Sequence, residues 1–325
     1  MTVRRIGKDG KFGDKRRWAW LALLLLLACQ THAHAAGILV VASSGAELYS
    51  RFIERFTTSL SGKDPETGIA DVAVVYLDKH SLTDDDLASR NAVVTVGTRA
   101  ARDVFARQLN IPVLYTIIPE SVYRTLAAPP AACAMQSAIF IDQPLARQAA
   151  LAQALFPDAV KYGVLLGPTS SQRQAEIDAL KKNTDRQLVV NVADHENDIP
   201  TSTTGLLHKV DLMLAVNDRL ALNRENAKWL LYSAYQRHLP VIGFSQAYVN
   251  AGAAGAVFSE PEQMARQAAE IVQHQIARPT SCMPAAGFPL YFRVAVNHSV
   301  CTSLGGALCD EHTLGKLLAD KESGK

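Results

Sequence analysis

The chain has 325 residues, of which 48% are hydrophobic and 20% charged, and its formal net charge is +2. The first 28 residues hold seven Lys or Arg against two Asp, so removing them lowers 33 bases and 31 acids to 26 and 29, a net charge of −3. Nothing in the charge of the remaining chain argues for a nucleic-acid partner, and the chain is long enough for two domains of ordinary size.

An export signal is predicted at residues 1–28, where a basic head precedes an apolar run that is too short to span a membrane. Residues 26–29, Leu-Leu-Ala-Cys, form a lipobox-like sequence directly after this run, which favours lipid attachment at Cys29. Ordinary cleavage after the Ala-His-Ala sequence at 33–35 is the alternative, and an uncleaved anchor is the third. Each of these predicts a location in the periplasm or cell envelope.

Four cysteines remain besides Cys29, and an even number in an exported chain is compatible with disulfides. A bridge from Cys282 to Cys301, or from Cys301 to Cys309, would link segments near the end of the chain. Cys133 lies far away in sequence, and a buried free thiol is an alternative for it. No spacing typical of a metal site accompanies these residues.

From residue 37 onward the chain alternates between short apolar runs and amphipathic stretches, which predicts alternating strands and helices. The apolar runs are nearly continuous, as in parallel strands covered by helices on both faces of a sheet. Expected strands in the first half are 37–43, 72–77, 92–97 and 111–118, separated by helices at 46–60, 84–89 and 98–109.

The alternation pauses at residues 119–136, where the sequence is rich in Ala and Pro, and we expect the chain to pass to a second lobe there. Expected strands of the second lobe are 137–142, 162–167, 187–192, 211–216 and 240–244, with helices at 145–156, 171–183, 199–208 and 224–237. A helix at 261–277 and a last strand at 290–296 complete the prediction.

Two apolar runs near residues 239–244 and 255–258 follow each other with no predicted helix between them. Parallel neighbours in one sheet need a crossover of about a dozen residues or more. We therefore expect the two strands to belong to different sheets, so that this segment bridges two lobes with a ligand cleft between them.

Several segments resemble the periplasmic substrate-binding proteins of ABC importers, in the branch typified by tryptophan and phenylalanine binders. These segments are VGTRAA at 96–101, IPVLY at 111–115, LFPDAVKYGVLLGP at 155–168, DLMLAVND at 211–218, the stretch 239–272 and FRVAVNHSV at 292–300. The resemblance implies an α/β fold of two Rossmann-like, doubly wound parallel-sheet lobes joined by hinge crossovers.

On this basis the first lobe is expected to contain residues 37–120 and 256–325, and the second lobe residues 137–245. The expected crossover segments are 119–136, 245–256 and 279–288.

A small zwitterion or anion in the cleft would be held by helix N-termini and hydroxyls, and these gather beyond the carboxyl ends of parallel strands. Thr98 and Asp218 have helix capping as a competing role, and Phe258 has core packing. The candidate ligand contacts are Ser43, Ser44, Gly97, Thr98, Thr116, Thr169, Ser170, Asn217, Asp218, Ser245, Gln246 and Phe258.

The tryptophan and phenylalanine binders have an Asp-Glu pair after the hinge strand, where this chain has Ser245 and Gln246. The loss of two carboxylates weakens the expectation of an α-amino acid ligand. The resemblance implies capture of a small organic solute and delivery to the membrane permease of an ABC importer. A ligand sensor for a signalling system, or a component of another uptake route, would use the same closure.

No nucleophile motif, phosphate loop or metal motif of recognised spacing occurs in the sequence. We therefore expect a binding protein that is not an enzyme, with no cofactor and no metal.

Overall fold

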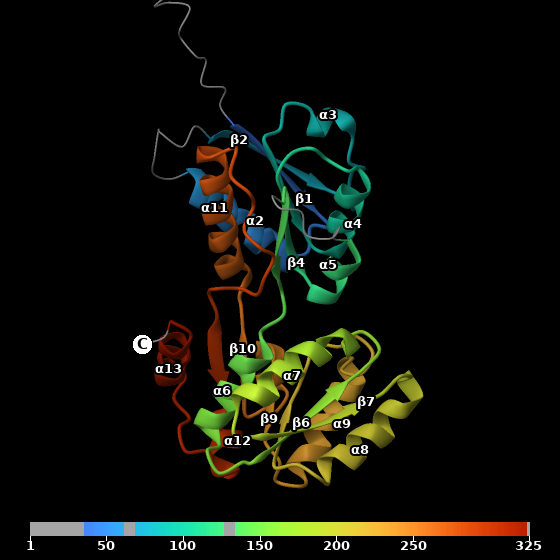
Figure 1. Cartoon of the computed structure of the whole chain (residues 1–325), viewed down its shortest axis with the longest axis vertical. Helices are drawn as coiled ribbons and strands as arrows, with labels where there is room; N and C mark the ends of the chain where they lie inside the picture. Colours follow the sequence, from blue (N-terminus) through green and yellow to red (C-terminus); the bar gives the residue numbers. More distant parts are fainter. Residues whose placement is uncertain (1–35, 62–68, 127–133, 324–325) are drawn as a thin grey trace, which may run out of the picture. The chain divides into compact units, whose positions relative to one another are not determined.

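A computed structural model describes residues 36–61, 69–126 and 134–323, which form two parallel-dominated α/β lobes (Figure 1). This confirms the predicted fold class. The expected signal peptide, the lipid attachment site Cys29 and residue Cys133 lie outside the described residues. Within the described residues, no helix has both the length and the apolar character needed to cross a membrane.

The first lobe is built on a five-stranded sheet whose strands are all parallel, in the order β2-β1-β3-β4-β5. The strands are almost entirely apolar, which suits a sheet that is buried on both faces. Their bounds are β1 Ala36–Ala42, β2 Ile69–Tyr76, β3 Ala92–Val96, β4 Val113–Ile118 and β5 Gln136–Phe140.

Alternate residues of β1 pack on opposite faces of this sheet. Ile38 and Val40 pack with helices α2 (Glu47–Ser61) and α11 (Pro261–Ala277). Leu39 and Val41 pack in the core that includes α4 (Thr98–Ala106), and α5 (Glu120–Leu126) adds to that face (Figure 1). The short α3 (Asp84–Leu87) completes the lobe.

The second lobe has a six-stranded sheet in the order β11-β10-β9-β8-β6-β7, in which only β10 and β11 pair antiparallel. Its strands are β6 Lys161–Leu166, β7 Gln187–Val192, β8 Leu212–Leu214, β9 Val241–Gly243, β10 Gly255–Phe258 and β11 Arg293–Val296.

Helices cover both faces of the second sheet. One core includes residues of α6, α7, α12 and α13, and the other includes residues of α8, α9 and α10. The bounds are α6 Leu145–Leu155, α7 Gln174–Asn183, α8 Ile199–Leu207, α9 Arg224–Tyr235, α10 Gln246–Asn250, α12 His298–Ser303 and α13 Glu311–Glu322. Single 3-10 turns at Ser171–Arg173 and Glu196–Asp198 precede α7 and α8.

The prediction that the strands near 239–244 and 255–258 lie in different sheets is wrong. Strands β9 and β10 are parallel neighbours in the second sheet, with Ile242 opposite Gly255. Their connection contains the five-residue helix α10, which gives the chain enough length for a crossover within one sheet. The segment 245–256 is therefore internal to the second lobe.

The lobe boundaries also differ from those expected. Strand β5 belongs to the first sheet, so α5 and β5, on either side of the crossover expected at 119–136, both lie in the first lobe. Strands β10 and β11 belong to the second sheet, while α11 between them packs on the first. The chain therefore crosses between the lobes at 141–144, at 259–260 and at 289–292, just beyond the expected segment 279–288.

A disulfide joins Cys301 of α12 to Cys309. It confirms one of the two expected pairings near the end of the chain and rules out the bridge between Cys282 and Cys301. Cys282 is also disulfide-bonded.

Candidate functional site

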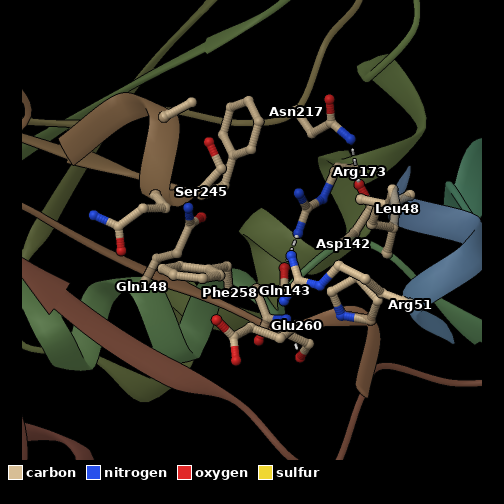
Figure 2. A pocket seen from close by; sticks show the side chains of 16 residues that line it. Leu48, Arg51, Asp142, Gln143, Gln148, Arg173, Asn217, Ser245, Phe258 and Glu260 are labelled. Atoms are coloured by element: carbon tan, nitrogen blue, oxygen red, sulfur yellow. Dashed lines mark hydrogen bonds between the residues drawn. The ribbon is translucent and has the colours of Figure 1, made fainter. Parts of the chain in front are cut away.

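A pocket of about 490 Å³ is lined by helix α2 of the first lobe, by two of the crossover segments and by the second lobe (Figure 2). Its size falls within the range of small-molecule sites, roughly 300–1,000 Å³. The lining residues are Leu48, Arg51, Ile141, Asp142, Gln143, Gln148, Arg173, Asn217, Phe244, Ser245, Gln246, Ala247, Phe258, Ser259, Glu260 and Pro261.

Four of the candidate residues line this pocket: Asn217, Ser245, Gln246 and Phe258. Each follows or ends a strand of the second sheet, as the argument from strand ends requires. Ser245 occupies the N-cap position of α10, but its side chain makes no capping hydrogen bond. Its hydroxyl is therefore not used by the helix.

The candidates of the first lobe do not line the pocket, and several have structural partners. The Ser43 hydroxyl accepts a hydrogen bond from the Ala100 N–H at 3.0 Å, and the Thr116 hydroxyl donates to the Thr95 carbonyl at 2.6 Å. Gly97, not Thr98, is the N-cap of α4. Ser44 Oγ lies 3.4 Å from the Ala46 N–H, within its own loop.

Gly97 is required by backbone geometry. Its φ is +90°, and an added Cβ would lie 2.6 Å from the Tyr49 hydroxyl and 2.7 Å from Ser43 Oγ. Only glycine can combine this positive φ with the close contact between the end of β3 and the side chains of Tyr49 and Ser43.

The remaining candidates, Thr169, Ser170 and Asp218, do not line the pocket and organise two adjoining loops of the second lobe, after β6 and after β8. Asp218 is 2% exposed and accepts hydrogen bonds from the backbone N–H groups of Thr169, Leu220 and Ala221. The Ser170 hydroxyl accepts from the Gly167 N–H. Asp218 therefore has a structural role, but not the expected one of helix capping, because the N-cap of α9 is Asn223.

Four side chains that the sequence reasoning missed form the buried polar part of the pocket: Asp142, Gln143, Gln148 and Arg173, which are 7%, 2%, 1% and 6% exposed. Two of them lie in the first crossover after β5. Gln148 projects from α6, and Arg173 ends the 3-10 turn before α7.

Asp142 is held by two neutral donors. The Glu120 N–H donates to Oδ2 at 2.7 Å, and Asn217 Nδ2 donates to Oδ1 at 3.2 Å. Burial raises the pKa of the Asp142 carboxyl above its ordinary value, although these hydrogen bonds and the charge of Arg173 act against that rise.

Arg173 is anchored on one side and open on the other. Its Nε donates to Glu176 at 2.8 Å and its Nη2 to the Gln143 carbonyl at 2.8 Å. Nη1 has no hydrogen-bond partner among the described residues, and Figure 2 shows the guanidinium directed into the pocket.

Gln148 carries an unsatisfied buried acceptor. Its Nε2 donates to the carbonyls of Ala215 and Gly243 at 3.0 and 3.2 Å, which fixes the amide orientation. Oε1 is buried and has no partner among the described residues. A buried acceptor of this kind is costly unless a ligand or water donates to it.

The apolar walls come from both lobes. Leu48 of α2 and Ile141 of the first crossover line the pocket with Phe244 and Phe258 of the second lobe. The Phe244 ring packs against Tyr248, with ring centroids 4.6 Å apart.

At the pocket edge, Arg51 pairs with Glu262 at 2.7 Å, and Glu260 pairs with Arg293 at 2.7 Å. No group of three or more His, Cys, Asp or Glu side chains in the described ranges is placed to hold a metal ion. The pocket offers hydrogen-bonding groups and rings to a small solute.

One sequence signal could have identified Gln148. Helix α6 is rich in Ala and Leu, and Gln148 is three residues after Leu145 and four before Ala152, both buried. A polar side chain on the apolar face of a helix must find a buried partner or a ligand. Arg173, in a polar stretch, gives no such signal.

Comparisons with known proteins agree with this architecture. The family model described as ABC transporter substrate binding protein matches residues 82–278. Comparison with curated proteins gave no significant match.

Three solved structures resemble the chain at low sequence identity, and this likeness concerns the fold alone. The complex of an ABC domain with L-Trp from Streptococcus pneumoniae has a TM-score of 0.57 and 16% identity, covering 86% of this chain and 97% of that chain. The ligand-free, open structure of CD0873, a substrate binding protein with adhesive properties from Clostridium difficile, has a TM-score of 0.65 and 17% identity, covering 83% and 95%. The arabinose binding protein AraP from Geobacillus stearothermophilus has a TM-score of 0.52 and 13% identity, covering 82% and 98%.

Proposed function

The chain belongs to the ABC transporter substrate-binding protein family, and we propose that it captures a small organic solute in the pocket described above and delivers it to an ABC importer. Asn217, Ser245, Gln246 and Phe258 are proposed ligand contacts, together with Gln148 and Arg173. Members of this family and the similar structures are solute-binding proteins, so the proposal involves no catalysis.

One observation carries the proposal. Gln148 Oε1 is a buried acceptor without a partner among the described residues, in a pocket of ligand size lined by both lobes. A solute that donates to this oxygen would remove the cost of leaving it unsatisfied. Its binding would therefore recover free energy that the unliganded protein lacks.

The crossover segments support closure over the solute. Asp142 and Gln143 lie in the first crossover, and Ser259 and Glu260 form the second. A solute seated in the pocket would contact the segments about which two lobes can hinge. Ligand binding would thus favour one arrangement of the lobes, as a delivery protein requires.

Delivery also requires export, and we propose that the protein works in the periplasm or cell envelope, anchored through Cys29. The disulfide between Cys301 and Cys309 supports this location because disulfides persist in oxidising compartments. Adjacent permease and ATPase genes would favour an importer as the partner, whereas an adjacent sensor kinase would favour signalling.

The substitution Ala247→Trp tests the pocket. Ala247 is an exposed residue of α10 that lines the pocket, so an indole there should fill the site without disturbing the core. A thermal-shift screen of amino acids, organic acids, sugars and nucleosides identifies the solutes that raise the melting temperature of the native protein. We expect the same solutes to leave the melting temperature of Ala247→Trp unchanged.

Ala251→Trp is the matched control, because Ala251 is exposed at the end of the same helix and does not line the pocket. It should respond to ligand as the native protein does. A ligand that stabilises Ala247→Trp and the native protein equally would show that this pocket is not the binding site.

A further inference from the structure

We propose that this pocket selects a neutral, polyhydroxylated solute, such as a sugar or cyclitol, over an amino acid or an organic anion. The inference rests on the proposed function and assigns a ligand class to the same site. It follows from how the charges of the pocket are already paired and from the neutral groups that remain open.

The charged groups at the pocket edge are already matched. Arg51 makes two hydrogen bonds to Glu262, at 2.7 and 2.9 Å, and the Glu260 carboxylate accepts from Arg293. A charged ligand group would have to displace one of these partners to form an ion pair there. Neither pair therefore provides a free charge for ligand recognition.

The two charged residues deeper in the pocket act on each other. Arg173 is near enough to Asp142 for its positive charge to influence that carboxyl, and it also pairs with Glu176 at 2.6 Å. A ligand ammonium at Asp142 would meet the positive charge of Arg173. A ligand carboxylate at Arg173, whether it belongs to an anion or to a zwitterion with its ammonium at Asp142, would meet the negative charge of Glu176, which already holds that guanidinium.

Such like-charge contacts are unfavourable where little water screens them. A hydroxyl avoids both penalties, because it can donate to Asp142 or accept from Arg173 Nη1 without adding charge. The same pair of residues that disfavours either ion therefore accommodates a neutral ligand at both positions.

The other open polar groups are neutral. Gln148 Oε1 needs a donor, and the Ser245 hydroxyl is not used as a helix cap. Asn217 Oδ1 has no hydrogen-bond partner among the residues that the structure describes, since only Nδ2 of that side chain is engaged. The pocket thus presents hydrogen-bond acceptors and donors close together. A ligand hydroxyl suits such a pocket because it can both donate and accept a hydrogen bond.

The aromatic rings of the pocket provide apolar surface for such a ligand. Phe258 and Phe244 line the pocket together with Leu48, so the solute meets apolar surface as well as polar groups. The faces of sugar and cyclitol rings carry C–H groups that pack on such surfaces, while their hydroxyl edges reach the amides and Arg173.

The test is a thermal-shift and calorimetric comparison on the purified protein with D-ribose, L-arabinose, D-galactose and myo-inositol, beside L-tryptophan, L-phenylalanine and phenylacetate. We expect at least one of the four polyhydroxylated solutes to raise the melting temperature and to give a measurable Kd, and the two zwitterionic amino acids and the phenylacetate anion to do neither. The proposal is overturned if none of the polyhydroxylated solutes binds or if an amino acid or phenylacetate binds more tightly.

These outcomes separate the ligand class from the proposed function. If an amino acid or phenylacetate binds and Ala247→Trp abolishes that binding, the function stands and the neutral class falls. If no solute of the broad screen binds, the proposed function falls as well.

Gln148→Leu tests the buried acceptor, and it should weaken binding of the cognate neutral solute at least about tenfold. Gln275→Leu is the matched control: Gln275 is a 3% exposed amide of α11 that also donates to a backbone carbonyl, away from the pocket. It should leave the Kd within about twofold of the native value.

If Gln148→Leu does not fold, Phe258→Leu provides the second variant, since it keeps apolar surface and removes the ring. It should also weaken binding about tenfold. Native affinity in a folded Gln148→Leu or Phe258→Leu protein would contradict the proposed contacts.

Discussion

Asp218 illustrates why a residue at a strand end is not necessarily a ligand contact. It follows β8, at the end of a parallel strand where binding groups are expected, yet its carboxylate bonds to backbone N–H groups of its own loop and of the loop after β6. Three backbone N–H groups saturate it, and an added Cβ on Gly167 would lie 2.8 Å from its carboxyl carbon. The sequence predicts that a polar group is needed at this position, but the direction of the side chain depends on the loop around it.

We expect Asp218→Asn to lower the free energy of unfolding by about 2 kcal/mol. An amide at this position must present an NH₂ group either to the Thr169 N–H or to the N–H groups of Leu220 and Ala221, so one donor faces another. Urea denaturation measures the loss. The Kd for ligand should stay within about twofold of native, because Asp218 does not line the pocket.

The stability difference should also depend on pH. Burial acts to raise the pKa of Asp218, but hydrogen bonds from its own loop and from the loop after β6 outweigh burial and hold the pKa below its ordinary value. The ionised carboxylate therefore stabilises the fold fully above its unfolded pKa of about 3.9, and this contribution is lost as pH falls through the lower folded pKa. The gap between native and Asp218→Asn should narrow below about pH 4. A stability difference that stays constant across this pH range would contradict the assignment.

At the scale of elements, the crossover segments and the last helix are tied together by one buried arginine. Arg147 of α6 is 5% exposed and binds both carboxylate oxygens of Glu322 in α13. Its Nη1 also donates to Gln143 in the first crossover and, at 3.1 Å, to the Pro289 carbonyl in the third. Because Gln143 lines the pocket, this arginine links α13 to the binding site.

Glu322→Gln should lower the free energy of unfolding by about 1–2 kcal/mol, because it removes the charge that compensates a buried guanidinium, although Glu322 itself is partly exposed. Chemical denaturation measures the change. Lys321→Gln is the control, since Lys321 is an exposed neighbour on the same helix for which the described residues provide no ion-pair partner. Equal stability of Glu322→Gln and Lys321→Gln would show that the pair contributes nothing.

The elements themselves were largely predictable from sequence, and their pairing was not. Apolar runs located the strands of both sheets, because parallel strands buried on two faces read as continuous apolar segments. The error at β9 and β10 came from α10, whose five residues are too few to show helical periodicity. Strand partners depend on contacts between distant segments, which local patterns do not encode.

Only part of the site was predicted, because some of its residues are brought together by contacts between distant segments. Strand ends indicated Asn217, Ser245, Gln246 and Phe258, which line the pocket. The buried polar group of Asp142, Gln148 and Arg173 comes from a crossover, a helix and a 3-10 turn. These segments are separated along the chain and meet only in the folded protein, so their proximity depends on the tertiary fold.

At the scale of the whole molecule, neither lobe is a continuous piece of chain. Helix α11 fills the core of the first lobe although it follows most of the second, and β11, α12 and α13 then return to the second. The chain crosses between the two cores three times, each time through a short segment. Any movement of one lobe relative to the other must therefore change the backbone conformation of these three segments. This topology suits a protein whose two stable lobes respond to a ligand between them.

The proposed delivery of a solute to an ABC importer requires the protein to work beside a membrane, and the sequence predicts how it would be held there. Residues 26–29 follow the apolar run of the export signal directly, so lipid attachment at Cys29 would place the binding lobes beside the membrane. We expect mass spectrometry of the mature N-terminus to find a lipid-modified Cys29, and the protein to fractionate with membranes. Cys29→Ser is the control and should abolish both observations while leaving ligand binding unchanged. A native protein that begins with a free amine at Ala36 would show that cleavage occurs after the Ala-His-Ala sequence instead. The mature protein would then carry no lipid at Cys29.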